Sequence, residues 1–169
     1  TKKLGVGSPK STATGYKPEG SAGAGAGGSI QKGTVEKIKT DILGFDDIAH
    51  GGIPKGRTTL VSGTSGSGKT IFGMQFLIGG LNDGEAGVFV TFEETPRDIA
   101  RNMKSFGWDL DKWTKDGKFL FVDASPSEDE TIEVGEFDLG AFLARILNAV
   151  NKIGAKRVVI DSISALFPR

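Results

Sequence analysis

Short apolar runs alternate with segments of helical periodicity over most of this chain, and this alternation limits the possible folds more than any other feature. Strands are predicted at residues 58–62, 87–92, 118–124 and 157–161. Helices are predicted at residues 70–82, from Pro96 to about Phe106, and at residues 139–153, where Gly154 provides a stop. Strands that alternate with helices favour an α/β fold, with a mostly parallel sheet covered by helices on both faces.

Residues 1–33 have a different composition. They contain 9 of the 26 glycines and five lysines against the single acid Glu19, with almost no large apolar residue. Such a segment cannot bury enough surface to offset the entropy lost on ordering, so we predict a flexible tail followed by a globular part at residues 34–169. The lysines could instead bind nucleic acid, but a few dispersed lysines usually only solvate a tail.

A glycine-rich loop links the first predicted strand to the first predicted helix. Residues 63–70 read GTSGSGKT and fit the pattern G-x-x-x-x-G-K-[ST]. Glycines let successive backbone N–H groups point at phosphate oxygens, while Lys69 supplies a cation and the Thr70 hydroxyl can ligate Mg²⁺. The strand before the loop and the helix after it are the context that this motif requires, so the loop predicts nucleotide binding.

Carboxylates end two of the other predicted strands. Glu93 and Glu94 follow the run GVFVTF, and Asp161 ends RVVID. The carboxyl ends of parallel strands lie at one edge of the sheet, so all three acids are expected beside the phosphate loop. There Asp161 would hold Mg²⁺ or its water, and one glutamate would orient or deprotonate the attacking water while its neighbour points elsewhere. The alternative is that these acids only cap the helices that follow.

Composition excludes several other kinds of site. The sequence has no cysteine and a single histidine, which rules out disulfides and thiolate chemistry and makes a zinc site very unfavourable. It has no run of 18 apolar residues and no apolar signal core at its N-terminus, so we expect a cytoplasmic location with no membrane contact. Residues 34–169 carry 16 basic and 20 acidic residues, a net charge of −4 that disfavours nucleic acid as a partner.

Four segments together resemble the first ATPase (CI) domain of the KaiC family of circadian clock proteins, which are RecA/DnaB-like P-loop ATPases. They are GFDDIAHGGIPKGRTTLVSGTSGSGKT, GVFVTFEET, SFGWDL and VVIDSISALF. The resemblance runs from about Val35 to Phe167, and it implies a RecA-like P-loop core that ends shortly after the Walker B strand in this chain. The strongly acidic stretch 127–138 and the long glycine-rich tail depart from the family pattern.

The resemblance also implies roles for individual residues. Glu93 matches the carboxylate that activates water, with Glu94 as its partner, and Asp161 matches the magnesium-side aspartate. Ser105 matches a serine that touches nucleotide. The phosphate-binding run, in which Thr70 is also the magnesium ligand, is matched by Ser65, Gly66, Ser67, Gly68, Lys69, Thr70 and Ile71.

At the level of the whole protein, the resemblance implies ATP and Mg²⁺ as cofactors and a homohexamer with ATP between subunits. It further implies serine/threonine autokinase activity in a second domain, with KaiA and KaiB as partners. Three alternatives remain: a RecA/DnaB-related ATPase acting on DNA, a KaiC-like signalling ATPase outside the clock, and a nucleotide-sensing scaffold whose turnover is incidental. His50 is expected to be structural, Trp108 and Trp113 to pack rather than stack a base, and the acidic stretch 127–138 to be a solvated loop.

Overall fold

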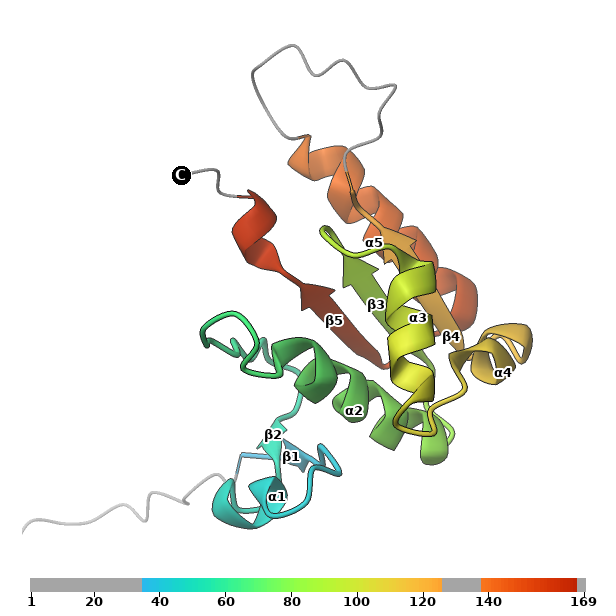
Figure 1. The fold of residues 1–169 in the computed structure, drawn as a ribbon. Coiled ribbons are helices and arrows are strands. Elements are labelled where there is room, and N and C mark those ends of the chain that lie inside the picture. The colour runs from blue at the N-terminus through green and yellow to red at the C-terminus, as the bar shows by residue number, and fades with distance from the viewer. Residues whose placement is uncertain (1–34, 126–137, 167–169) are drawn as a thin grey trace, which may run out of the picture. The chain divides into compact units, whose positions relative to one another are not determined.

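Three parallel strands form the central sheet, in the order β4, β3, β5 (Figure 1). The structure is a computed structural model that describes residues 35–125 and 138–166, all of which lie in the compact unit Thr34–Arg169. Its elements are β1 Lys37–Ile38, α1 Phe45–Ile48, β2 Ile53–Pro54, α2 Lys69–Asn82, β3 Gly87–Thr91, α3 Pro96–Lys104, α4 Leu110–Lys115, β4 Phe119–Asp123, α5 Leu139–Ile153, β5 Arg157–Asp161 and the 3₁₀ helix η1 Ile163–Leu166.

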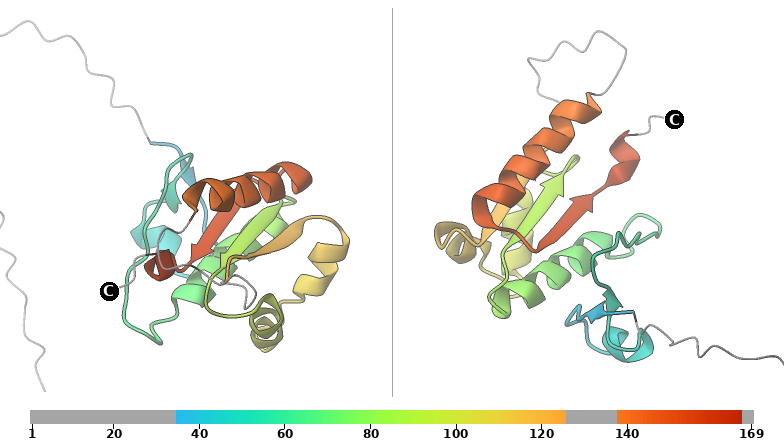
Figure 2. Two further views of the ribbon diagram at one scale, coloured as in Figure 1. Left: turned by 90° about the horizontal axis from the view of Figure 1, so that it is seen from above. Right: turned by 180° about the vertical axis from the view of Figure 1, so that it is seen from behind.

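Helices cover both faces of the sheet, as Figure 2 shows, with α5 on one face and α2 and α3 on the other. The central strand β3 is buried along its whole length, and its side chains alternate between the two layers. Phe89 packs in the core shared with α2, α3 and α4, whereas Val88 and Val90 pack in the core shared with α5. Continuous burial explains why the strand sequence is apolar on both faces.

The parallel register brings the ends of the three strands into one row. Thr91, the last residue of β3, is the register partner of Asp123 in β4 and of Asp161 in β5. Hence whatever follows each strand emerges at the same edge of the sheet, which is where a ligand binds in open α/β sheets.

A small antiparallel pair, β1 with β2, precedes the sheet and includes the short helix α1 between its strands. Asp46 organises this segment, because its carboxylate accepts hydrogen bonds from the backbone N–H groups of Thr40 and Asp41 and from the Thr40 hydroxyl. Arg157 ties it to the sheet by donating to the carbonyl of Lys39 at 3.0 Å.

Most of the predicted elements are confirmed. The helices predicted at residues 70–82 and 139–153 form as α2 and α5, and the capping residues act as expected. Gly154 takes a left-handed conformation (φ 64°) after α5, and Thr95 caps α3 by accepting a hydrogen bond from the Asp98 N–H. The strands predicted at residues 87–92, 118–124 and 157–161 form as β3, β4 and β5.

The strand predicted at residues 58–62 is wrong. This segment is irregular in the structure, and Leu60 and Val61 are 79% and 41% exposed. A β-branched run forms a strand only where a neighbouring strand pairs with it, and in the described part of the chain β5 pairs with β3 alone. The predicted tail and nearly all of the acidic stretch 127–138 lie outside the described residues.

One smaller expectation is confirmed. Trp108 and Trp113 are partly buried against the core on the α2 and α3 side, which confirms that they pack. Within residues 35–125 and 138–166, no helix is both long and apolar enough to cross a bilayer.

Candidate active site

A cavity of about 660 Å³ lies at the edge of the sheet where the strands end. Three sequence-predicted groups meet in it: the phosphate loop, the two glutamates after β3, and the aspartate at the end of β5. Its lining residues are Gly63, Ser65, Gly66, Gly68, Lys69, Thr70, Ile71, Thr91, Glu93, Glu94, Ile99, Asn102, Met103, Phe106, Asp161, Ser162 and Ser164. Both the size and the mixture of charged and apolar walls suit a nucleotide.

The phosphate loop leads directly into the positive end of α2. Gly68 is the N-cap residue with φ 86°, a left-handed conformation that glycine adopts without strain, and Lys69 is the first residue of the helix. The Lys69 ammonium donates to the carbonyl oxygens of Gly63 and Thr64, at 3.0 Å and 2.9 Å. The loop therefore holds a cation above a helix N-terminus, an arrangement that attracts anions.

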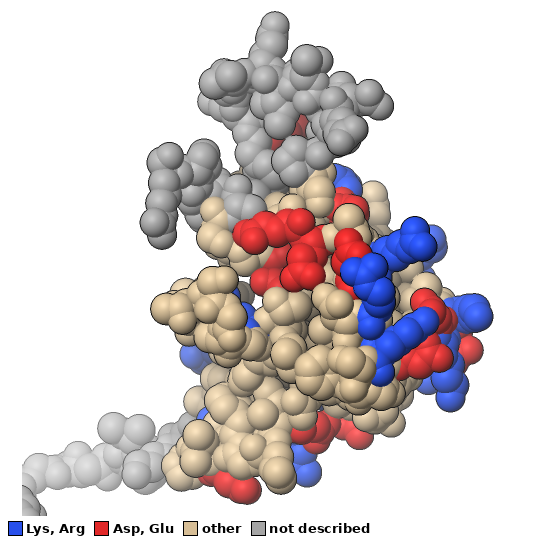
Figure 3. Space-filling model, in the orientation of Figure 1, with Lys and Arg blue, Asp and Glu red and all other residues tan. Residues whose placement is uncertain are grey.

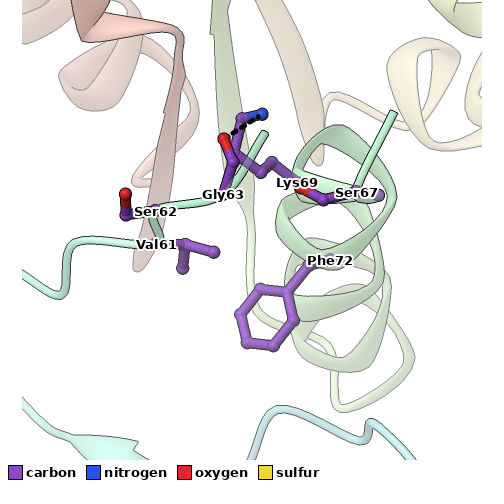
Figure 4. A pocket seen from close by; sticks show the side chains of 7 residues that line it. Val61, Ser62, Gly63, Ser67, Lys69 and Phe72 are labelled. Carbon is purple, nitrogen blue, oxygen red and sulfur yellow. Dashed lines mark hydrogen bonds between the residues drawn. The ribbon is translucent and has the colours of Figure 1, made fainter. Parts of the chain in front are cut away.

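A second, smaller cavity of about 170 Å³ adjoins the loop. Figure 4 shows it between the side chains of Val61 and Phe72, with Lys69 bonded to Gly63 above it. Ser67 lines this smaller cavity rather than the larger one, so it is the one member of the predicted phosphate-binding run that does not line the larger cavity.

Thr70 and Asp161 are joined directly. The Thr70 hydroxyl donates to Asp161 Oδ2 at 2.6 Å, although the two residues lie 91 positions apart in the sequence. Two hard oxygen ligands are thus side by side next to the phosphate loop, where the sequence predicted a magnesium site. Mg²⁺ is usually held by one or two protein oxygens of this kind together with substrate phosphates, so the donor set fits the ion.

Glu93 and Glu94 are both exposed, and both line the larger cavity. The expectation that alternation would separate their side chains is not met, because β3 ends at Thr91 and residues 92–94 form a bend instead of a pleated strand. Ser162, which follows Asp161, lies 3.4 Å from Glu93 Oε1 through its hydroxyl.

The start of α3 fixes the chain immediately after the glutamates. The Thr95 hydroxyl donates to Asp98 Oδ2 at 2.8 Å and accepts from the Asp98 N–H at 3.2 Å. The hydrogen bond from Thr95 and the nearby Arg101 guanidinium hold the pKa of Asp98 below its ordinary value. Thr95 and Asp98 thus cap the start of α3, so the glutamates are not its N-cap.

Ser105 lies near this cavity without lining it. Its hydroxyl donates to the Asn102 carbonyl at 2.7 Å, at the end of α3. The residues around it that do line the cavity are Ile99, Asn102 and Met103, which form one face of α3, and Phe106, which follows the helix. Sequence reasoning missed this face, although its helical spacing was the signal that could have revealed it.

Charged side chains are distributed unevenly over this side of the molecule. Figure 3 shows a group of Asp and Glu over the ends of the strands and the start of α3, while many of the visible Lys and Arg lie at the right of the view, mixed with further Asp and Glu. Within the described residues, no cluster of three or more His, Cys, Asp or Glu side chains forms a metal cage.

Comparison with known proteins identifies the family. The family described as "ATPase: KaiC" matches residues 38–169. Over 134 residues, 79% of this chain, it is 54% identical to the circadian clock protein KaiC3 of Synechocystis sp. and 55% identical to the circadian clock oscillator protein KaiC of Synechococcus elongatus. The corresponding protein of Acaryochloris marina is 58% identical over the same length, and the chain spans 26% of the length of each of these relatives. A chain with this fold, this loop and this breadth of match belongs to the KaiC ATPase family.

Proposed function

We propose that this chain binds ATP with Mg²⁺ and hydrolyses it by attack of water on the γ-phosphate. The observation that carries the proposal is the meeting of Lys69, Thr70, Glu93 and Asp161 in one cavity, with the Thr70 hydroxyl bonded to Asp161 at 2.6 Å. These groups come from three separate parts of the sequence, and each has a defined part in phosphoryl transfer.

The phosphate loop would bind the triphosphate. The N–H groups of residues 68–70 at the N-terminus of α2 provide donors and a positive dipole, and Lys69 adds a mobile cation. Lys69 now bonds to two carbonyl oxygens of its own loop. Its ammonium has three protons, so one proton is left to bond a phosphate oxygen while both of these hydrogen bonds are kept.

Thr70 and Asp161 would be the two protein residues that hold Mg²⁺. When bound there, the ion would neutralise charge on the β- and γ-phosphates. The hydroxyl–carboxylate bond already places the two oxygens together, so little rearrangement of side chains is required.

Glu93 would position the attacking water and accept its proton. A carboxylate that lines the same cavity as Lys69 and Thr70 has the charge and the reach for this role, and Glu93 is such a carboxylate. Glu94 also lines the cavity and would assist by its charge or by orienting Glu93.

The role of the whole protein is a further part of the proposal. Because its relatives are named as circadian clock proteins, we propose a clock ATPase that assembles as a homohexamer, acts with KaiA and KaiB, and carries serine/threonine autokinase activity in the rest of the polypeptide. A KaiC-like signalling ATPase outside the clock would use the same site, so the site does not distinguish the two roles. A DNA-acting ATPase would need basic loops along a DNA path, and the carboxylates gathered at the site edge in Figure 3 disfavour it.

Equilibrium binding and phosphate release in the full-length protein test this proposal. Lys69→Ala should weaken ATP binding by roughly 100-fold or more, since the phosphates lose a charge-assisted hydrogen bond and a cation. Lys152→Ala removes an exposed lysine from α5 and serves as the matched control. Undiminished ATP affinity in Lys69→Ala would show that the phosphate loop is not part of the ATP site.

A further inference from the structure

We infer that Thr91 is a positioning residue for the Glu93–Glu94 pair, and this inference rests on the proposed hydrolytic function. Thr91 ends β3 two residues before Glu93 and is 1% exposed. Its hydroxyl donates to the Glu94 carbonyl at 2.7 Å and so closes the turn that carries both glutamates.

The burial of this hydroxyl needs an explanation. The rest of β3 is glycine and apolar residues, and a valine at position 91 would have nearly the same shape without the cost of taking a hydroxyl out of water. That cost is offset only where the hydroxyl has a hydrogen-bond partner. The partner here is the main-chain carbonyl of Glu94, in the turn that leads into α3. The threonine is therefore placed to act on that turn.

Thr91 is itself firmly held. It pairs in register with Asp123 and Asp161, and its carbonyl accepts a hydrogen bond from the Ala124 N–H at 2.8 Å. The next residue, Phe92, donates its N–H to the Asp161 carbonyl at 3.1 Å. A β-branched side chain on a central strand also has little χ1 freedom, so the hydroxyl has a nearly fixed position.

The two glutamates thus lie between two fixed threonines. Thr91 anchors the turn on the strand side, and Thr95 anchors it on the helix side through its bonds with Asp98. Loss of the Thr91 bond would free the peptide group after Glu94 to rotate, and the carboxylates attached to this turn would sample more positions. A reacting group displaced by about 1 Å can lose roughly 100-fold in rate, whereas phosphate binding at residues 63–70 would not change.

The test compares Thr91→Val, which is isosteric but lacks the hydroxyl, with Thr91→Ser, which retains it. In the full-length protein we expect Thr91→Val to lower kcat by roughly 10- to 100-fold with the Kd for ATP changed by less than about threefold, and Thr91→Ser to recover most of the rate. Thr114→Val is the matched control, because it removes a threonine hydroxyl bond to a main-chain carbonyl (Leu110, 2.9 Å) on α4 and should leave kcat unchanged. If the Thr91→Val protein does not fold, Thr91→Ala, which also lacks the hydroxyl, is measured in its place.

A double-mutant cycle with Glu93→Gln, measured by single-turnover hydrolysis, separates this inference from the proposed function. If Thr91 acts through Glu93, Thr91→Val should slow the Glu93→Gln protein much less than it slows the wild type. Equal slowing in both backgrounds, or normal turnover in Thr91→Val while Glu93→Gln is inactive, would overturn the positioning role and leave the hydrolytic site intact. Normal turnover in Glu93→Gln itself would instead overturn the proposed function, and the role of Thr91 with it.

Discussion

The hydroxyl of Thr70 and the carboxylate of Asp161 are hydrogen-bonded at 2.6 Å, which joins the first turn of α2 to the last residue of β5. The bond links the helix that follows the phosphate loop to Asp161, the residue that the sequence predicted would hold magnesium. It places two side-chain oxygens together at one edge of the sheet, so the proposed metal site adjoins the phosphate loop.

The first prediction concerns this pair. Thr70→Val keeps the shape of the side chain and removes one oxygen, and it should weaken Mg²⁺-dependent ATP binding by roughly tenfold, or about 1.4 kcal/mol. Thr70→Ser, which retains the hydroxyl, should bind nearly as the wild type does. Titration with ATP in Mg²⁺ and again in EDTA distinguishes the effects, because the variants should differ only when the metal is present. A defect of equal size in EDTA would show that Thr70 acts on packing and not on the ion.

The second prediction concerns Arg157, a buried cation at the start of β5. Its side chain is 3% exposed, pairs with Glu85 at 2.7 Å and donates to the carbonyls of Lys39 and Phe76. Arg157→Ala should lower the free energy of unfolding by roughly 3–5 kcal/mol, because three partly buried, charge-assisted hydrogen bonds are lost together. Glu85→Gln should cost clearly less, since the Glu85 side chain is 36% exposed and Arg157 keeps its two carbonyl partners.

Denaturant unfolding of the two variants, with hydrogen exchange over residues 35–56 as a local probe, measures this difference. The Arg157→Ala protein should lose protection in that segment first, because Arg157 donates to the Lys39 carbonyl. Equal destabilisation by both variants would mean that the ion pair, and not the backbone contacts, carries the effect.

The third prediction uses two glycines with left-handed backbones. Gly52 (φ 108°) lies so close to β1 that an added Cβ would be 2.1 Å from the Ile38 carbonyl oxygen, whereas an added Cβ at Gly56 (φ 67°) would meet no atom within 4 Å. Gly56→Ala should therefore cost only the backbone strain, roughly 1–2 kcal/mol, while Gly52→Ala should cost more and displace β1 from β2. Comparison of their thermal unfolding and of exchange at residues 36–38 checks this, and similar losses for the two would contradict it.

The parts of the fold and site that the sequence revealed are those determined by local chemistry. The phosphate loop, the caps at Thr95 and Gly154, and Asp161 at a strand end all depend on a residue type at a fixed position in a motif. Their placement in the structure agrees with those expectations because parallel strand ends necessarily share one edge of the sheet.

The parts that sequence reasoning missed depend on contacts between distant segments. Residues 58–62 have strand propensity, yet they form no strand because no described strand pairs with them. The β1–β2 pair has only two residues in each strand, too few for a periodic signal, and it is held by the side chains of Asp46 and Arg157. Likewise the importance of Thr91 appears only once its hydroxyl is seen to reach the Glu94 carbonyl.

The fourth prediction is a pH dependence in the segment around α1. Partial burial by itself would raise the pKa of Asp46, but the hydrogen bonds from the Thr40 hydroxyl and from the N–H groups of Thr40 and Asp41 outweigh it and hold the pKa below its ordinary value. A depressed folded-state pKa means that the ionised carboxylate adds stability that is fully present above the unfolded pKa of about 3.9 and is lost as the pH falls through the folded value.

Asp46→Asn should remove this pH-dependent component. Hydrogen exchange of the Thr40 and Asp41 amides, followed from pH 6 to about pH 3, should show wild-type protection falling toward that of the variant in the acid range. Asp47→Asn changes the same charge on an exposed neighbour and should behave as the wild type does. A constant difference between the wild type and Asp46→Asn at every pH would contradict the ionised cap.

The most direct test of the account is the effect of Glu93→Gln on ATP binding and phosphate release, measured together in the full-length protein. The amide keeps the shape of the side chain but cannot deprotonate water, so turnover should fall by roughly 10²- to 10⁴-fold. The Kd for ATP should stay the same or decrease, because the proposed phosphate contacts are those of the loop at residues 63–70 and a carboxylate beside the γ-phosphate would repel it. Normal phosphate release in Glu93→Gln, or a joint loss of binding and turnover, would contradict the water-activating role of Glu93.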